Sequence, residues 1–284
     1  MRLGYVTRYS EEEVRFARQA GFDCLELSVR MGTELDPVRV SEGKIEEVKR
    51  VLAENGIKVA SLLSDANHLH PDPERRREAN EHFIRAMDLC KRLGTDVLAG
   101  NAGGDRTKTL EENISVFGEV FNRYTEVAEE KGVRIALENC PHASRDWPIS
   151  MGNIALSPVA WEMMFEAVPS PNIGLEYDPS HLVWLGIDYI QAIYDFGERI
   201  FIVHAKDTEI LPDALDVEGI YGHEWWRYRI PGWGGIDWRD LFSALWEVGF
   251  QGDVVIEHED PVFAGERRKE GLRLGFEYLK QFVF

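Results

Sequence analysis

Residues 131–139, with the sequence KGVRIALEN, contain the pattern that decides the fold. A glycine ends a charged amphipathic segment, an apolar run of strand-forming residues follows, and a polar residue closes that run. The same order of helix, glycine and strand recurs in AGFDCLEL (20–27), NGIKVASL (55–62), LGTDVLAG (93–100) and VGFQGDVVIE (248–257). The chain is therefore predicted to be built from repeated units of one helix and one strand.

Eight short runs have the composition of strands that are buried on both faces. They are RLGYVT (2–7), DCLELSV (23–29), KVASLLS (58–64), TDVLAG (95–100), RIALEN (134–139), NIGLEYD (172–178), IFIVHAKD (200–207) and DVVIEHE (253–259). Eight strands that alternate with helices predict an α/β fold, a (β/α)8 TIM barrel with a single domain over residues 1–284. An open doubly wound sheet is the weaker alternative, because no G-x-G-x-x-G follows the first run and the sequence has no P-loop.

The segments between these runs carry helix signals at both ends. Ser10, with Glu13 three residues later, predicts a capping box at the start of the first helix, and Gly21 predicts its end. Three later helices are each predicted to end at a glycine: Gly56, Gly94 and Gly132.

The longest irregular stretch is residues 208–237, which we expect to form a long active-site loop, because loops of this length in compact domains are usually lids or binding loops. It is rich in aromatic residues: Tyr221, Trp225, Trp226, Tyr228 and Trp233. Aromatic rings suit the apolar faces of sugars, so a sugar-facing lid is one interpretation. A small satellite core or an oligomer contact is the other, and the sequence leaves both open.

Bulk composition restricts the classes of function. The sequence has 32 Lys and Arg against 50 Asp and Glu, and this formal net charge of −18 disfavours nucleic acid and anionic membranes as partners. No apolar run approaches the length of a membrane span, and the first residues predict a strand and a helix instead of a signal peptide. The predicted location is the cytoplasm, where Cys24, Cys90 and Cys140 are expected to be reduced thiols.

Four strand runs carry, at their carboxyl ends, a polar residue that a buried strand does not need: Glu138, Asp178, His204 and Glu257. They are 40, 26 and 53 residues apart, so only the fold can assemble them, and a barrel places all strand carboxyl ends at one face. Three carboxylates and one imidazole form a shell that suits a divalent cation. Each also has a structural interpretation, because an acid can cap the next helix and a histidine can be a hydrogen-bonded core residue.

Motifs at these positions resemble the xylose-isomerase-like superfamily of TIM-barrel sugar isomerases and epimerases, particularly its ketose 3-epimerase and inosose-processing branches. The motifs are LEN (137–139), DPSH (178–181), HAKD (204–207), RIPGWGGID (229–237) and IEHE (256–259), and the resemblance covers nearly the whole chain. It implies that the four strand-end residues bind one divalent metal ion, with Mn²⁺ preferred over Co²⁺, Mg²⁺ or Zn²⁺. It also implies that the two glutamates exchange protons with the substrate.

The chemistry of such an enzyme begins with proton removal from a carbon next to a carbonyl. A divalent cation bound to two adjacent substrate oxygens neutralises the enediolate charge that develops. One carboxylate removes the proton, and a second carboxylate on the opposite face returns it with inverted configuration. Return of the proton to the neighbouring carbon gives an aldose–ketose isomerisation instead. Glu138 and Glu257 are the predicted catalytic pair, with Asp178 and His204 fixing the metal.

Five further residues are predicted to contact the substrate: His181, Lys206, Arg229, His70 and Asn101. The resemblance implies that His181 touches a substrate oxygen near the metal, whereas an interior hydrogen bond is the structural alternative. For Lys206, the alternative is an ion pair with a neighbouring loop. His70 belongs to SDANHLH (64–70), which also contains His68 and looks like a second metal cluster, although one substrate contact is the preferred interpretation.

Three other functions stay open. A sugar or inosose dehydratase would use the same metal and enediolate to expel a β-hydroxyl. An abasic-site endonuclease shares the fold and the D-x-x-H pattern, but it needs more histidines than the segment NAGG (101–104) supplies. A non-catalytic sugar-binding subunit is disfavoured because Glu138 and Glu257 are intact. The predicted substrate is a sugar or polyol, with phosphorylated sugars, free ketoses, inososes and keto-glycosides as alternatives, and homo-oligomerisation stays open.

Overall fold

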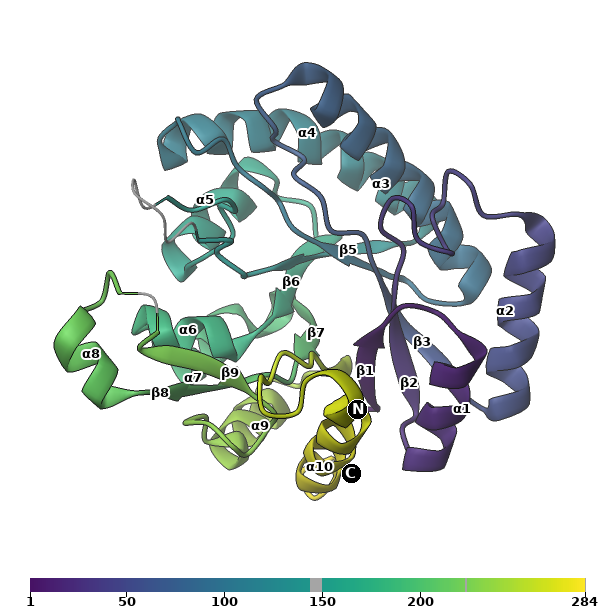
Figure 1. Cartoon of the computed structure of the whole chain (residues 1–284). Helices are drawn as coiled ribbons and strands as arrows, with labels where there is room; N and C mark the ends of the chain where they lie inside the picture. Colours follow the sequence, from purple (N-terminus) through teal and green to yellow (C-terminus); the bar gives the residue numbers. More distant parts are fainter. Residues whose placement is uncertain (144–149, 223, 284) are drawn as a thin grey trace.

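The computed structural model describes residues 1–143, 150–222 and 224–283, and it contains a closed barrel of eight parallel strands (Figure 1). Around the barrel the strands follow the order β1-β10-β7-β6-β5-β4-β3-β2, so β10 closes onto β1. Their bounds are β1 (Leu3–Thr7), β2 (Cys24–Ser28), β3 (Lys58–Leu63), β4 (Val97–Gly100), β5 (Arg134–Glu138), β6 (Ile173–Tyr177), β7 (Ile200–His204) and β10 (Asp253–Ile256). The predicted (β/α)8 barrel is confirmed, and the open sheet is excluded.

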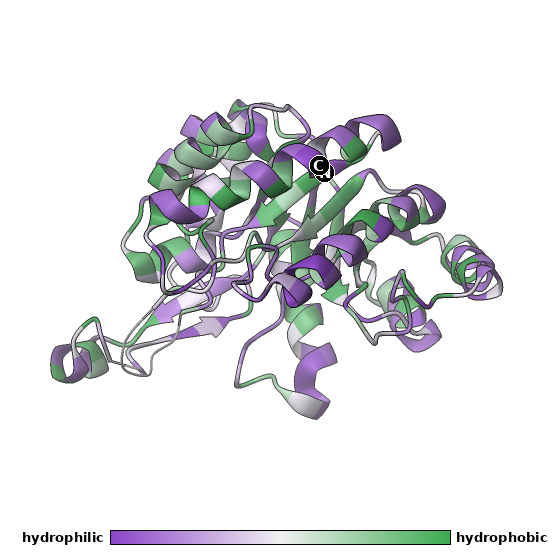
Figure 2. Ribbon diagram, turned by 90° about the horizontal axis from the view of Figure 1, so that it is seen from above, coloured by the Kyte–Doolittle hydropathy of each residue, from purple (hydrophilic) through white to green (hydrophobic). Residues whose placement is uncertain are grey.

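Most of the helices surround the barrel and bury apolar side chains against its outer surface, while their hydrophilic faces point outward (Figure 2). Their bounds are α1 (Glu11–Ala20), α2 (Glu42–Asn55), α3 (Pro73–Leu93), α4 (Leu110–Lys131), α5 (Pro158–Ala167), α6 (Pro179–Leu185), α7 (Tyr189–Phe196), α8 (Pro212–Glu218), α9 (Trp238–Glu247) and α10 (Arg268–Leu279), with short 3-10 turns η1 (Gly197–Arg199) and η2 (Gly265–Arg267). Among these described helices, none combines the length and apolar composition of a bilayer span.

The predicted helix ends and the Ser10 cap are confirmed, and the predicted capping box is corrected. The glycines after α1 to α4 all adopt positive φ, as left-handed caps: Gly21, Gly56, Gly94 and Gly132. At α1, Ser10 accepts the backbone N–H of Glu13, as predicted. The capping box is nevertheless only half formed, because the Glu13 carboxylate contacts Thr7 and Arg268 instead of the Ser10 backbone.

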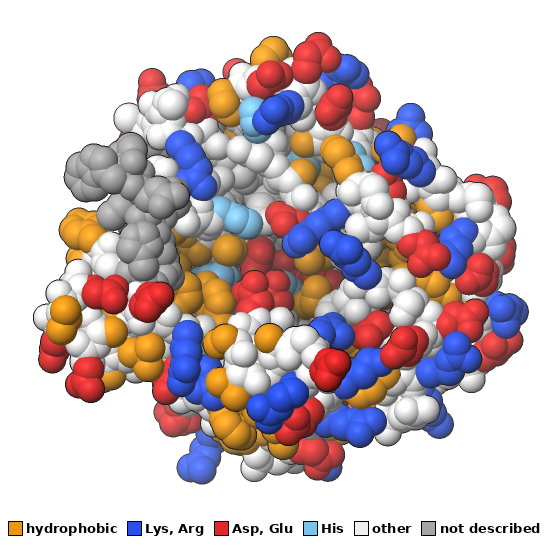
Figure 3. Space-filling model, in the orientation of Figure 1, with side chains coloured by type: hydrophobic (Ala, Val, Ile, Leu, Met, Phe, Trp, Pro, Cys, Tyr) orange, Lys and Arg blue, Asp and Glu red, His pale blue; other side chains and the backbone are white. Residues whose placement is uncertain are grey.

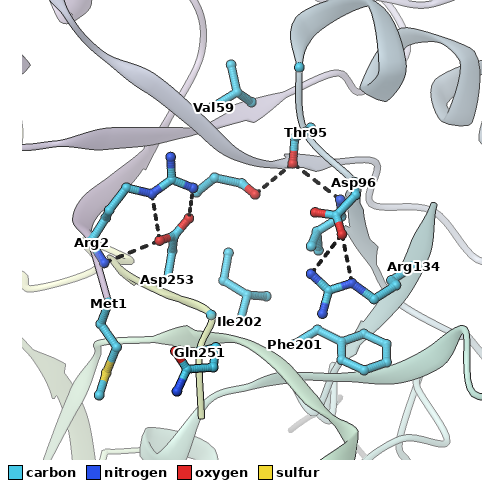
Figure 4. A pocket seen from close by; sticks show the side chains of 14 residues that line it. Met1, Arg2, Val59, Thr95, Asp96, Arg134, Phe201, Ile202, Gln251 and Asp253 are labelled. Carbon is cyan, nitrogen blue, oxygen red and sulfur yellow. Dashed lines mark hydrogen bonds and ion pairs between the residues drawn. The ribbon is translucent and has the colours of Figure 1, made fainter. Parts of the chain in front are cut away.

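The amino end of the barrel is closed by paired charges (Figure 4). Arg2 donates to Asp253 from Nε at 2.9 Å and from Nη2 at 2.5 Å, and Arg134 donates to Asp96 at 3.0 Å. A cavity of about 290 Å³ lies among these pairs. Because each arginine already faces a carboxylate, this end does not attract an anion, in keeping with the stabilising role of the amino face in barrels of this kind.

The stretch 208–237, predicted to be an irregular loop, contains regular structure. Strands β8 (Asp207–Ile210) and β9 (Trp226–Arg229) pair as an antiparallel hairpin, and α8 lies between them in sequence. The prediction of irregular structure is therefore wrong for this part of the chain. The alternation of Trp226 and Tyr228 with two arginines is a strand signal that the high aromatic content concealed.

Asp207 fixes the turn that follows the hairpin. Its buried carboxylate accepts the backbone N–H groups of Gly232 at 3.0 Å and Ile236 at 3.1 Å, and the indole N–H of Trp238 at 2.9 Å. A Cβ atom on Gly234 would lie 2.3 Å from Asp207 Oδ1, so the turn can approach this carboxylate only with glycine at that position. Gly234 of the RIPGWGGID motif therefore serves this close approach.

Replacing Asp207 with alanine would leave these buried donors without an acceptor. We expect Asp207→Ala to lower the free energy of unfolding, measured by urea denaturation, by about 2–4 kcal/mol. Asp216→Ala, at an exposed position of α8, is the control and should change it by less than about 0.5 kcal/mol. Equal stabilities of the two variants would contradict the structural role of Asp207.

Candidate active site

The four polar strand ends meet at the carboxyl face of the barrel. Glu138 ends β5, Asp178 follows β6, His204 ends β7 and Glu257 follows β10. Their ligand atoms all lie within 4.8 Å of one another, and we refer to these four side chains as the strand-end cluster. Figure 3 shows acidic and histidine side chains at the floor of a central hollow on this face. The barrel thus brings together side chains that are far apart in the sequence.

Asp178 has one structural oxygen and one oxygen that faces the cluster. Oδ1 accepts the N–H of Ser180 at 2.8 Å and caps α6. Oδ2 lies 3.0 Å from Lys206 Nζ and 3.3 Å from His181 Nε2, yet it accepts no well-aligned hydrogen bond among the described residues. The Asp178 carboxylate can therefore cap α6 with one oxygen and take part in the site with the other.

His204 presents its two ring nitrogens to different carboxylates. Nδ1 lies 3.5 Å from Glu138 Oε1 and 3.4 Å from Glu257 Oε2, within the cluster. Nε2 lies 3.0 Å from Glu176 Oε1 and 3.5 Å from Glu26 Oε2. Burial alone would lower the pKa of His204, but the charges of these carboxylates raise it well above its ordinary value. This point of the barrel therefore favours positive charge.

Lys206 brings positive charge into the cluster. Its buried ammonium lies 2.5 Å from Glu257 Oε2 and 3.0 Å from both Glu259 Oε2 and Asp178 Oδ2. Burial alone would lower the pKa of Lys206, but these three carboxylates raise it well above its ordinary value. The sequence left two interpretations of Lys206 open, a position in the barrel mouth or an ion pair with a neighbouring loop. In the structure, Lys206 points into the barrel mouth, and its ion pairs form there.

His181 joins the cluster from the first turn of α6. Its Nε2 lies 3.5 Å from Glu138 Oε1, and its Nδ1 lies 2.8 Å from the hydroxyl of Tyr228 on β9. The Tyr228 ring also faces Lys206, with Nζ 4.5 Å from the ring centroid. The hairpin therefore supplies one wall of the site, although the sequence placed Tyr228 only within an aromatic loop.

Both glutamates of the cluster are held ionised. Burial alone would raise the pKa of Glu138, but the neighbouring imidazoles of His181 and His204 hold it well below its ordinary value. Burial alone would also raise the pKa of Glu257, but the positive charge of Lys206 has the larger effect, so the pKa of Glu257 is lowered. Because an ionised carboxylate can accept a proton, either glutamate is competent as a base.

Arg229, a predicted substrate contact, forms ion pairs outside the strand-end cluster. Its guanidinium donates from Nε to Asp260 Oδ2 at 2.9 Å and from Nη1 to Glu209. Asp260 also accepts the backbone N–H groups of Ile230 and Val262. These bonds tie β9 to the segment after β10, and contact between Arg229 and a substrate stays a prediction.

The SDANHLH motif (64–70) forms no second metal cluster among the described residues. His68 is a core residue whose Nδ1 lies 3.0 Å from the Tyr124 hydroxyl, and burial lowers the pKa of His68 to about 3. His70 is half-buried beside the start of α3, outside the strand-end cluster. Asn101 lines a cavity of about 250 Å³ formed by the segments after β3 and β4.

The sequence interpretation missed two buried glutamates behind His204. Glu26 on β2 and Glu176 on β6 are fully buried, and Ser61 donates a hydrogen bond to Glu26 at 2.7 Å. Burial and the charge of Glu26 raise the pKa of Glu176 well above its ordinary value. A carboxylate on the outer nitrogen of a metal-binding histidine fixes its tautomer, so this pair would direct the Nδ1 lone pair into the cluster. Both acids interrupt apolar strand runs, which is the signal that identified the strand ends.

Comparison with known proteins gives consistent matches over nearly the whole chain. Residues 14–282 match the family described as xylose isomerase-like TIM barrel. The chain is 26% identical to an inosose isomerase of Bacillus velezensis, over 87% of this chain and 82% of the relative. It is 26% identical to a ketose 3-epimerase of Arthrobacter globiformis, over 90% and 81%, and 23% identical to an inosose dehydratase of Clostridium perfringens, over 78% and 76%.

Solved structures share the fold at lower identity. The IolI protein with a bound zinc atom superposes with a TM-score of 0.78 at 20% identity, covering 100% of this chain and 99% of that one. D-psicose 3-epimerase from Clostridium cellulolyticum gives 0.75 at 18% identity, over 100% and 99%.

Asp178 and Asp188 offer a matched test of cation binding, because both cap a helix and only Asp178 lies in the cluster. Asparagine caps helices as well as aspartate, so both substitutions should preserve the helices. We expect Asp178→Asn to weaken Mn²⁺ affinity, measured by calorimetry, at least about 10–100-fold, because it removes a charged ligand. Asp188→Asn should bind Mn²⁺ like the wild type. Unchanged affinity in Asp178→Asn would place the metal elsewhere.

Proposed function

Because the chain belongs to the xylose isomerase-like TIM barrel family, we propose that it is a divalent-metal-dependent isomerase or epimerase of a sugar or polyol ketone. The observation that carries the proposal is the pair of ionised glutamates, Glu138 and Glu257, each within 3.5 Å of His204 Nδ1. The same proposal includes manganese as the metal, the cytoplasm as the location and residues 208–237 as an active-site segment.

The side chains of the cluster fit a divalent cation. Asp178 Oδ2 and His204 Nδ1 are buried and have no well-aligned hydrogen bond among the described residues, although buried polar atoms are normally satisfied. Lys206 supplies one positive charge against the three carboxylates of the cluster. The zinc atom bound in the similar IolI structure supports metal binding by this fold. When bound, a divalent cation would stabilise the enediolate charge on two adjacent substrate oxygens.

The residues of the chain supply the proton transfers. The glutamate that faces the reacting carbon accepts its proton, and the second glutamate returns a proton from the opposite face in an epimerisation. His181 is oriented for contact with a substrate oxygen, because Tyr228 fixes its Nδ1 at 2.8 Å while Nε2 faces Glu138. The similarity to an inosose isomerase and a ketose 3-epimerase supports this reaction class.

The second candidate reaction is dehydration of a keto-polyol, and the position of Lys206 supports it. Its buried ammonium lies beside Glu257 and could donate a proton to a departing β-hydroxyl, a step that epimerisation does not require. The inosose dehydratase relative supports this alternative. Mass spectrometry of the product distinguishes the two candidates, since only dehydration removes a water.

The proposal predicts that exchange of substrate hydrogen with D₂O depends on both glutamates. We expect Glu138→Gln and Glu257→Gln each to slow deuterium wash-in, followed by NMR across ketoses, inososes and keto-glycosides with Mn²⁺, by roughly 10²–10⁴-fold. Each amide variant lacks a proton acceptor but keeps nearly the same volume, so substrate should still bind.

Glu130→Gln, on the exposed surface of α4, serves as the control and should retain wild-type exchange. Near wild-type exchange in either cluster variant would show that the glutamate it replaces is not a catalytic base.

A further inference from the structure

A separate apolar cavity lies between the end of α6, the hairpin and α8. Its volume is about 490 Å³, and none of its described lining residues carries a charge. The lining is mostly aliphatic and aromatic, and it includes Val183, Trp184, Leu185, Ile210, Leu215 and Trp226. We refer to it as the apolar cavity. Its volume falls within the range of about 300–1,000 Å³ that is usual for small-molecule sites.

Two elements connect the apolar cavity to the strand-end cluster. On α6, Trp184 lies three residues after His181, close to one helical turn. On β9, Trp226 and Tyr228 are two residues apart and share one face, with ring centroids 4.7 Å apart. Tyr228 also contacts His181, whose Nε2 lies 3.5 Å from Glu138 Oε1, so two side chains link the wall of the cavity to the cluster.

The wall itself is flat and has a polar group without a partner. The indoles of Trp184 and Trp226 stack with centroids 4.7 Å apart and an interplanar angle of 5°. Trp184 Nε1 is buried and donates no hydrogen bond within the described residues. A flat aromatic wall favours a planar apolar group, and a buried N–H without an acceptor favours an occupant that carries an oxygen.

We propose that the apolar cavity binds the aromatic aglycone of a keto-glycoside whose sugar ring lies at the strand-end cluster. The cavity lies next to the cluster, is uncharged and has a flat indole wall, as an aryl group requires. The glycosidic oxygen, or an oxygen on the aryl group, would accept the hydrogen bond of Trp184. An uncharged lining does not suit the phosphate of a sugar phosphate. This inference rests on the proposed function, because it names the substrate class of the same site.

A pair of α8 variants tests the inference. Leu215 lines the apolar cavity, whereas Val217, two residues later, is 86% exposed and is not a lining residue.

The probes are 4-nitrophenyl and methyl 3-keto-β-D-glucoside, and the measurement is deuterium exchange next to the carbonyl in D₂O with Mn²⁺. In the wild type, the aryl probe should have a KM at least about tenfold below that of the methyl probe, because the aryl group leaves water. Leu215→Glu should abolish this preference without slowing exchange of the methyl probe, and Val217→Glu should keep it.

The binding of unoxidised 4-nitrophenyl β-D-glucoside, measured by calorimetry, separates this inference from the proposed function. Exchange with equal KM for both probes would overturn the inference and leave the proposed function intact. Binding that Leu215→Glu abolishes, with no exchange of either probe or of any ketose or inosose, would support the cavity and overturn the proposed function. Absence of both exchange and binding would overturn the inference. A dimer in sedimentation experiments that Leu215→Glu dissociates, together with equal KM for both probes, would also overturn the inference. The cavity would then be a contact between two copies of the chain.

Discussion

Buried carboxylates that share one site must be matched by positive charge, and this requirement governs the barrel mouth. Transfer of one ion from water into a protein interior costs several kcal/mol even after relaxation. Glu138, Asp178 and Glu257 meet within a few ångströms, and a single lysine ammonium, that of Lys206, lies among them. The raised pKa of His204 is a second sign of the same excess of negative charge. A divalent cation at the cluster is the simplest way to balance it.

The rest of the fold holds this costly arrangement in place. Each cluster residue stands at the end of a barrel strand, so backbone pairing fixes its position. Asn139 adds a clamp between β5 and β6, because its side chain accepts the N–H of Asp178 and donates to its carbonyl. On the other side, the turn around Asp207 anchors the hairpin that delivers Tyr228 to His181. The structural hydrogen bonds and the site are therefore parts of one network.

Sequence patterns were sufficient for the barrel and for the four strand ends, because both follow from periodicity: glycine stops, apolar runs and polar residues at their ends. They did not reveal contacts between side chains of different elements. The ion pairs of Arg229 with Asp260 and Glu209 are one example, because no local pattern shows them. The hairpin was concealed because its strands are short and separated by a helix. Glu26 and Glu176 were missed, although each interrupts an apolar strand, because in strands that are apolar on both faces the pattern does not show whether a side chain points into the barrel or toward the helices.

The proposed metal centre consists of the four strand-end side chains holding one divalent cation at the barrel mouth. Its direct test is anomalous diffraction at the manganese edge, from crystals of the wild-type protein grown with Mn²⁺. We expect one strong peak at about 2.0–2.4 Å from carboxylate oxygens of Glu138, Asp178 and Glu257 and from His204 Nδ1. A peak on the Nε2 side of His204, between Glu26 and Glu176, or no peak at saturating Mn²⁺, would contradict it.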